Sequence, residues 1–173
     1  MAQLRIPLDA QRFAKGLTWK DYTAQMGDTR ARTEDNYTKS VLTEDERKFC
    51  AGLTQVRYVL MLAENWCGDV HRNSPLIAHM CEAMPNCELR VFLRDKNPDL
   101  MDRYLNQGLY RSIPVFAFFD ESMKEMARFI ERPPAQTEEI EKKMLEVRRA
   151  LRAERYPEWR EGVVKEIRSL LKV

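Results

Sequence analysis

The chain has 173 residues, and its 29 Lys and Arg nearly balance its 27 Asp and Glu, which gives a formal net charge of +2. This balance argues against a protein that coats nucleic acid, because phosphate contacts need a concentrated excess of cations. Hydrophobic residues make up 44% of the chain and charged residues 32%. That composition predicts one compact domain over residues 1–173, with a buried core and no bias towards disorder.

Neither export nor membrane insertion is expected. Residues 1–10 include Arg5, Pro7 and Asp9 and lack the apolar segment of a secretory signal. The longest apolar run, residues 113–119, is far shorter than the roughly 20 residues that a spanning helix needs. We therefore expect a soluble cytoplasmic protein. In that compartment its four cysteines should be reduced thiols rather than a disulfide framework.

Helices and buried strands are predicted to alternate along most of the chain. Apolar residues at helical spacing predict two helices within residues 8–39. Thr43 and Glu46 form a capping-box pair that begins a short helix ending near residue 53. The remaining elements follow from β-branched composition, helical periodicity and Pro or Gly boundaries. They are strands over 56–63, 89–94, 113–119 and 126–130, and helices over 70–84, 97–106, 137–154 and 157–172.

The sequence Trp-Cys-Gly-Asp-Val at residues 66–70 links a predicted buried strand to a helix, and Ile113-Pro114 begins a later strand. This order resembles the thioredoxin fold, an α/β fold with a central mixed sheet flanked by helices. The resemblance covers roughly residues 42–153, with extra helices over 1–41 and 154–173. More narrowly, residues 64–75 look like those of bacterial thioredoxin-like proteins whose active site reads Trp-Cys-Gly-Asp-Cys.

Cys67 is the candidate catalytic residue. A thiol in the first turn of a helix faces unpaired backbone N–H groups and the positive end of the helix dipole, which stabilise a thiolate. Trp66 offers a flat apolar rim, and Gly68 allows close approach of a substrate. The resemblance implies that Pro114 is cis and that it turns the backbone of Ile113 towards a docked peptide. The predicted substrate-binding residues are Trp66, Gly68, Asp69, Val70, Ile113 and Pro114.

This sequence departs from the Trp-Cys-Gly-Asp-Cys motif at Val70, where the bacterial thioredoxin-like proteins have a second cysteine. A dithiol oxidoreductase uses that second cysteine to release its mixed disulfide. Cys81 lies about 21 Å further along the same predicted helix at 1.5 Å per residue, which is beyond the reach of a disulfide. For Cys50, Cys81 and Cys87 we expect packing in the core.

Three function classes remain open, and the first two are favoured. The first is monothiol exchange, in which Cys67 forms mixed disulfides with a protein or with a glutathione-like thiol. The second is a redox-inactive binding or scaffold protein that uses the same groove. Iron–sulfur assembly is a weaker third, because only Cys-Gly matches the monothiol proteins that perform it. No cofactor is predicted, and the sequence leaves the substrate, the reductant and the oligomeric state open.

His71 follows Cys67 by one helical turn and has three interpretations. Its imidazolium could assist the thiolate, the two residues could be metal ligands, or His71 could be an exposed helix residue. The exposed residue is favoured, and no metal site is predicted because no third ligand lies nearby in the sequence. His79 is also expected at the surface. Asp69 could be a carboxylate that stabilises the start of the helix, or its charge could disfavour the Cys67 thiolate by repulsion, and the first interpretation is favoured.

Overall fold

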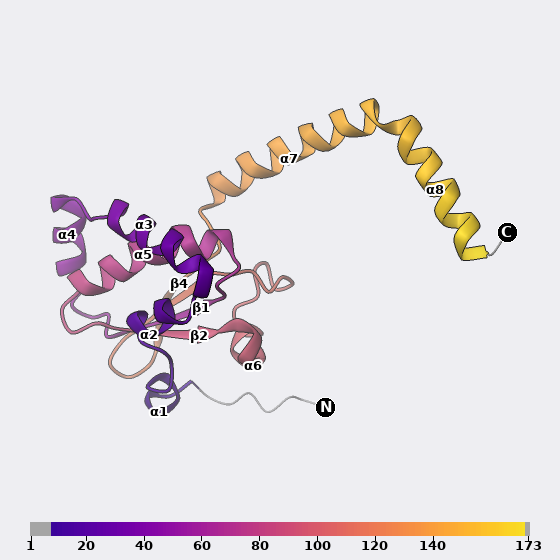
Figure 1. The fold of residues 1–173 in the computed structure, drawn as a ribbon. Coiled ribbons are helices and arrows are strands. Elements are labelled where there is room, and N and C mark those ends of the chain that lie inside the picture. The colour runs from indigo at the N-terminus through magenta and orange to yellow at the C-terminus, as the bar shows by residue number, and fades with distance from the viewer. Residues whose placement is uncertain (1–7, 172–173) are drawn as a thin grey trace. The chain divides into compact units, whose positions relative to one another are not determined.

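The computed structural model describes residues 8–171, which form two compact units divided between Arg132 and Pro133. The first unit contains the whole sheet (Figure 1). The second contains two helices, α7 (Pro134–Glu154) and α8 (Tyr156–Leu171). The expected single domain, with its boundaries near residues 42 and 154, stays a prediction. Lys172, the expected last residue of α8, lies outside the described residues.

The sheet has four strands in the order β2-β1-β3-β4. They are β1 (Tyr58–Ala63), β2 (Glu88–Leu93), β3 (Val115–Phe119) and β4 (Glu125–Ile130). Strands β1 and β2 pair in parallel, whereas β1–β3 and β3–β4 are antiparallel. A parallel pair needs a crossover connection, which α5 (Gly68–Ala83) supplies. The predicted mixed sheet flanked by helices is confirmed.

Helices cover both faces of the sheet, and successive residues of β1 show which helix lies on which face. Tyr58 and Val59 point to opposite faces, because side chains alternate along a strand. The ring of Phe13 packs edge-on against Tyr58 at 5.1 Å, which places α1 on that face. Val59 packs in a cluster with Cys50 and Cys81, which places α4 and α5 on the other. The cluster containing Val59 is called the lower core below.

The helices of the first unit other than α5 are short. They are α1 (Ala10–Phe13), α2 (Trp19–Ala24), α3 (Arg30–Lys39), α4 (Glu44–Ala51) and α6 (Pro98–Met101), with 3-10 turns at Gly27–Thr29 and Arg94–Lys96. The predicted capping box is confirmed. Thr43 accepts a hydrogen bond from the backbone N–H of Glu46, and its own N–H donates to the Glu46 carboxylate at 2.8 Å.

The expected two helices within residues 8–39 are three α-helices and a 3-10 turn. An extended segment separates α1 from α2, because Leu17 pairs with Val91 of β2 through two backbone hydrogen bonds of 2.8 Å. Gly16 is required there, since an added Cβ would lie 2.7 Å from the ring of Phe92. Contact with a distant strand therefore interrupts what local periodicity predicts as helix.

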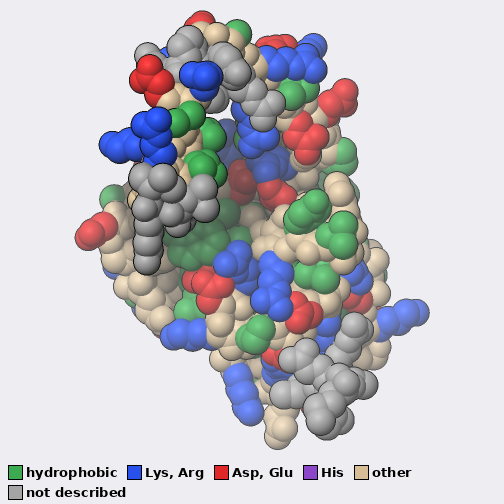
Figure 2. All heavy atoms as spheres, turned by 90° about the vertical axis from the view of Figure 1, so that its right-hand side faces the viewer, with side chains coloured by type: hydrophobic (Ala, Val, Ile, Leu, Met, Phe, Trp, Pro, Cys, Tyr) green, Lys and Arg blue, Asp and Glu red, His purple; other side chains and the backbone are tan. Residues whose placement is uncertain are grey.

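The charged side chains do not segregate by sign on the face shown in Figure 2, where Lys and Arg are interspersed with Asp and Glu. This arrangement agrees with the near balance of charge in the sequence. Among the described residues, no helix is both long enough and apolar enough to span a bilayer.

Candidate functional site

Cys67 lies at the junction between β1 and α5, as the N-cap residue of the helix. Its backbone is extended (φ −85°, ψ 122°), and its carbonyl accepts the N–H of His71 at 3.2 Å. Its side chain caps no backbone N–H group, so the sulfur is not engaged by its own helix. The thiol is half-buried. The sequence therefore places a reachable sulfur beside the N–H groups of the first helical turn.

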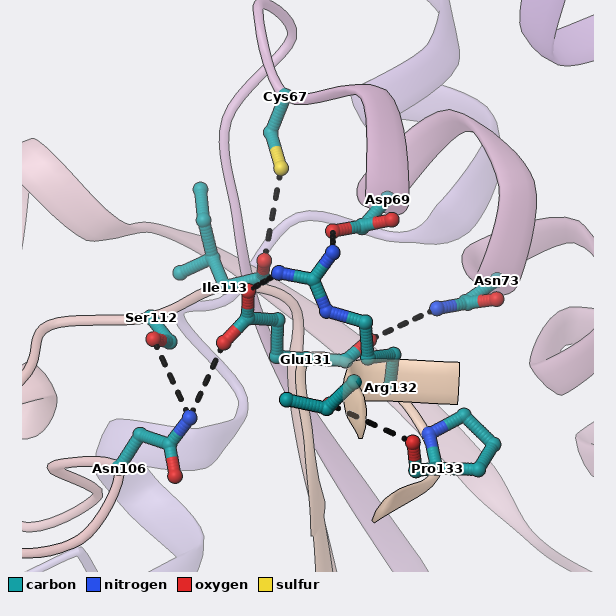
Figure 3. A network of polar contacts seen from close by, with 10 residues as sticks. Cys67, Asp69, Asn73, Asn106, Ser112, Ile113, Glu131, Arg132 and Pro133 are labelled. Carbon is teal, nitrogen blue, oxygen red and sulfur yellow. Dashed lines mark hydrogen bonds and ion pairs between the residues drawn. The ribbon is translucent and has the colours of Figure 1, made fainter. Parts of the chain in front are cut away.

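The tertiary fold brings the segment that begins β3 to this sulfur. Cys67 Sγ donates a hydrogen bond to the carbonyl oxygen of Ile113 at 3.4 Å (Figure 3). The Ile113–Pro114 peptide bond is cis, the geometry that the resemblance implies. Cys67, Ile113 and Pro114 thus lie together although they come from separate parts of the chain.

Trp66 directly precedes Cys67 and is exposed, with 57% of its surface accessible. The guanidinium carbon of Arg94 lies 4.7 Å from the centre of its ring, within range of a cation–π interaction. Gly68 is also exposed, and an added Cβ would meet no atom within 4 Å. These two residues therefore present an open surface beside the thiol, with Arg94 as a contributor that sequence reasoning missed.

Val70 does not share that exposed surface. It is 0% exposed and belongs to the main core, so its side chain cannot contact a docked partner, contrary to the expectation. The physical reason is the helical spacing, which turns the position three residues after Cys67 inwards against the sheet. Ile113 is also buried, at 5% exposure, and it offers its backbone carbonyl rather than its side chain.

Asp69 in the first turn of α5 is tied to the end of β4 by ionic and hydrogen-bonding groups. Arg132 Nη1 lies 3.4 Å from its carboxylate, and the same guanidinium pairs with Glu131. Asn106 donates to the Glu131 carboxylate at 3.0 Å, and Asn73 of α5 donates to the Glu131 carbonyl at 2.8 Å (Figure 3). Asp69 therefore holds the start of α5 against Arg132, 63 residues further along the chain, and no local sequence pattern predicts this network.

His71 is not exposed, and that expectation is wrong. It is 2% exposed, and its Nδ1 lies 2.7 Å from the hydroxyl of Thr33 on α3. Asn36 donates to the His71 carbonyl at 2.9 Å. Burial lowers the pKa of His71, which disfavours the imidazolium proposed to assist the thiolate. His71 instead joins α3 to α5, because α3 packs over the face of α5 that the histidine occupies.

His79 also departs from the surface position expected for it. Its side chain is 16% exposed, its ring stacks on Tyr37 at 3.9 Å, and its Nε2 lies 2.9 Å from the Tyr37 carbonyl. Within residues 8–171, no group of three or more His, Cys, Asp and Glu side chains could hold a metal ion.

Two buried polar residues beneath the site were not recognised from the sequence. Glu64 is 9% exposed; its side chain accepts the N–H of Asp95 at 2.8 Å and its carbonyl accepts the N–H of Cys67 at 3.3 Å. Tyr22 is 1% exposed and its hydroxyl makes no hydrogen bond. Burial raises the pKa of Tyr22, and the nearby Glu64 and Cys67 add to that shift. The position of Glu64 at the end of a buried strand is the one sequence signal that could have singled it out.

The other three cysteines lie in or against the lower core, as expected. Cys50 is 0% exposed, Cys81 is 5% exposed, and Cys87 packs against the same cluster. Cys67 instead packs against the main core. The structure therefore separates Cys67 from the remaining thiols.

Comparison with known proteins gives the same fold. A family model described as thioredoxin matches residues 16–148. A solved structure of a protein of unknown function from Pseudomonas aeruginosa superposes with a TM-score of 0.62 at 21% identity, covering 71% of this chain and 76% of that one. An HIV epitope scaffold gives a TM-score of 0.64, also at 21% identity, covering 73% and 78%. No curated protein matched. Since the family model spans most of the sequence, the chain belongs to the thioredoxin family.

Proposed function

We propose that this protein exchanges thiols and disulfides through Cys67 alone and forms mixed disulfides with a protein or a glutathione-like thiol. The observation that carries the proposal is the position of the sulfur. Cys67 Sγ lies at the N-cap of α5, 3.4 Å from the Ile113 carbonyl oxygen and beside Pro114. Membership of the thioredoxin family supports a thiol–disulfide role in general terms.

The exchange step uses Cys67 as the nucleophile. Its thiolate attacks one sulfur of a disulfide, a new S–S bond forms, and the old S–S bond breaks. The departing thiolate takes the bond's electron pair and then a proton from solvent. The N–H groups of the first turn of α5 stabilise the negative charge before the attack. Because Ile113 accepts a hydrogen bond from the resting thiol, this interaction must break when the thiolate forms.

Release of the mixed disulfide requires a second thiol from outside the chain. Val70 stands where a resolving cysteine would be, and the other three cysteines lie in or against the lower core. An external thiolate therefore attacks the mixed disulfide, forms its own S–S bond with the bound group and returns Cys67 to its reduced form. This requirement makes the proposed activity dependent on a low-molecular-weight thiol or a partner protein.

The alternative is a redox-inactive binding protein of the same fold. The exposure of Trp66 favours it, because large aromatic residues at a protein surface often anchor a partner. The Arg94 guanidinium over the Trp66 ring would suit a partner with acidic groups. Both functions use the same surface, so the reactivity of Cys67 separates them.

The test is to incubate the reduced full-length protein with oxidised glutathione, alkylate the remaining thiols and map the peptides. Arg57 and Arg72 border a tryptic peptide, residues 58–72, in which Cys67 is the only cysteine. We expect this peptide to carry one glutathione, which added dithiothreitol removes. Cys67→Ser should remove the adduct from this peptide without changing the other cysteine peptides.

The contrary result is a peptide 58–72 that stays fully alkylated while free glutathione disulfide is in excess. That outcome would refute thiol exchange and favour the binding protein. Trp66→Ala provides a matched variant, because it alters the exposed surface and leaves the thiol in place. A thiol-exchange protein should keep single-adduct formation with glutathione in this variant, since the small disulfide does not need a wide docking surface.

A further inference from the structure

The lower core contains a second group of cysteines at the opposite end of α5 from Cys67. Cys81 lies in the last turn of α5, and Cys87 immediately precedes β2. The helix between residues 67 and 81 extends about 21 Å at 1.5 Å per residue, so this group is separate from the candidate site. Nothing in the proposed exchange at Cys67 uses these thiols.

A tight chain reversal brings Cys87 back to Cys81. The N–H of Met84 donates to the carbonyls of Met80 and Cys81 at 3.1 and 3.3 Å, and the N–H of Cys87 donates to the Met84 carbonyl at 3.4 Å. Asn86 adopts a positive φ of 56°, which completes the turn. Cys81 is buried in the lower core and Cys87 packs against that core, so the turn brings both residues to one cluster. Adjacent thiols held by such a short loop meet the first requirement for a disulfide, which is proximity.

The two thiols differ in access and in charge environment. Cys81 is 5% exposed, whereas Cys87 is half-buried and reachable from solvent. Interaction with the Cys81 thiol and the charge of Arg57 lower the pKa of Cys87, against the opposing effects of burial and Glu88. Interaction with the Cys87 thiol and burial raise the pKa of Cys81. Cys87 is therefore the nucleophile of the pair and Cys81 the proton donor.

Arg57 is a second, independent sign that this place suits a negative charge. Its Nε is buried and makes no hydrogen bond. Its backbone carbonyl accepts the N–H of Glu88 at 2.9 Å, which fixes Arg57 beside the residue that follows Cys87. A buried guanidinium nitrogen without a partner is costly unless an anion lies nearby, and a thiolate on Cys87 supplies one.

We propose that Cys81 and Cys87 form a peroxide-sensitive redox pair, independent of Cys67, that closes an internal disulfide between the end of α5 and the start of β2. In the first step the Cys87 thiolate attacks an oxygen of hydrogen peroxide. An S–O bond forms, the O–O bond breaks, and hydroxide leaves and is protonated to water. The product is a sulfenic acid on Cys87.

In the second step the sulfur of Cys81 attacks the sulfur of the Cys87 sulfenic acid. The S–S bond forms, the S–O bond breaks, and hydroxide leaves as water with the proton of the Cys81 thiol. Overall, two thiols lose two electrons and one peroxide becomes two waters. Hydrogen peroxide suits the site because it is small enough to reach a half-buried sulfur.

The sequence makes the test direct. Arg72 and Arg90 border a tryptic peptide, residues 73–90, that contains Cys81 and Cys87 and no other cysteine. The reduced full-length protein is treated with hydrogen peroxide, unfolded in the presence of iodoacetamide and digested. Glu82 then allows a second protease specific for glutamate to cut between the two cysteines, so that only a disulfide holds the fragments together.

We expect peptide 73–90 to lose both alkylation sites together and to stay joined after the second cut until a reductant is added. Cys67→Ser should leave this result unchanged. Cys81→Ser should leave Cys87 unable to form the disulfide, so that a dimedone adduct of its sulfenic acid accumulates. Alkylation of both cysteines after peroxide treatment would overturn the proposal, and so would a disulfide that joins Cys81 to Cys50 in peptide 49–57.

Substitutions of Arg57 test whether Cys87 is the activated thiol without changing either cysteine. Arg57→Gln should slow disulfide closure several-fold, because the Cys87 thiolate loses the nearby positive charge that stabilises it. Arg57→Lys keeps the charge and should restore most of the rate. Equal rates in the two variants would show that the charge plays no part and would overturn the assignment of Cys87 as the activated thiol.

Discussion

The buried contact between Thr33 and His71 gives a prediction whose size follows from the structure. Thr33 is 0% exposed, and its hydroxyl lies 2.7 Å from Nδ1 of a histidine that is 2% exposed. Thr33→Val keeps the shape of the side chain but leaves the ring nitrogen without a partner. Because an unsatisfied buried polar group costs about 1–3 kcal/mol, the free energy of unfolding should fall by that amount.

The same histidine should make stability depend on pH. Burial lowers the pKa of His71 in the folded protein, whereas the unfolded value is about 6.5. Below pH 6.5 the unfolded chain therefore binds a proton that the folded protein does not. The stability that neutral His71 contributes is complete above pH 6.5 and is lost as the pH falls towards the lowered pKa. The loss is at most about 1.4 kcal/mol per pH unit in that interval.

Urea unfolding at pH 7.5 and pH 5.5 measures both effects. Thr33→Ser is the matched control, since it keeps the hydroxyl and should lose less stability than Thr33→Val at pH 7.5. His71→Gln removes the titrating ring, so its stability should change less between the two pH values than that of the wild type, by about 1 kcal/mol. Equal stability of Thr33→Val and Thr33→Ser, or an unchanged pH dependence in His71→Gln, would refute the reasoning.

Three further predictions concern the site and its support. Val70→Cys should raise the rate of disulfide reduction with a dithiol-regenerating system, because it places a second thiol three residues after Cys67; an unchanged rate would contradict this, and Val70→Ser is the control. Tyr22→Phe should raise the free energy of unfolding by about 1 kcal/mol, because it removes a buried hydroxyl that makes no hydrogen bond; a lower thermal midpoint would contradict this. Asp99→Asn should lower the free energy of unfolding by about 1 kcal/mol, because Arg12 donates two hydrogen bonds to the carboxylate, and Asp95→Asn at an exposed ion pair should change it less; an equal effect of the two substitutions would contradict this.

The elements that the sequence by itself determined are those governed by short-range interactions. The capping box of Thr43 and Glu46 needs only residues three apart, and the structure confirms it. Strand β1 is recognisable because a strand at the centre of a sheet is apolar on both faces. Two local patterns identified the fold. The Trp-Cys-Gly turn follows a buried strand and precedes a helix, and Pro114 begins a later strand.

The tertiary structure decided what lies against each of these elements. His71 has the same helical position whether or not α3 covers it, so the periodicity of α5 alone could not predict its burial. The ion pair of Asp69 with Arg132 and the unpartnered hydroxyl of Tyr22 likewise depend on residues far apart in sequence. Local preferences act over a few residues, whereas burial and pairing depend on which faces of distant elements meet. The sequence therefore indicated that Cys67 lies where α5 begins. Only the folded chain placed the Ile113 carbonyl beside its sulfur and the Arg132 guanidinium beside Asp69.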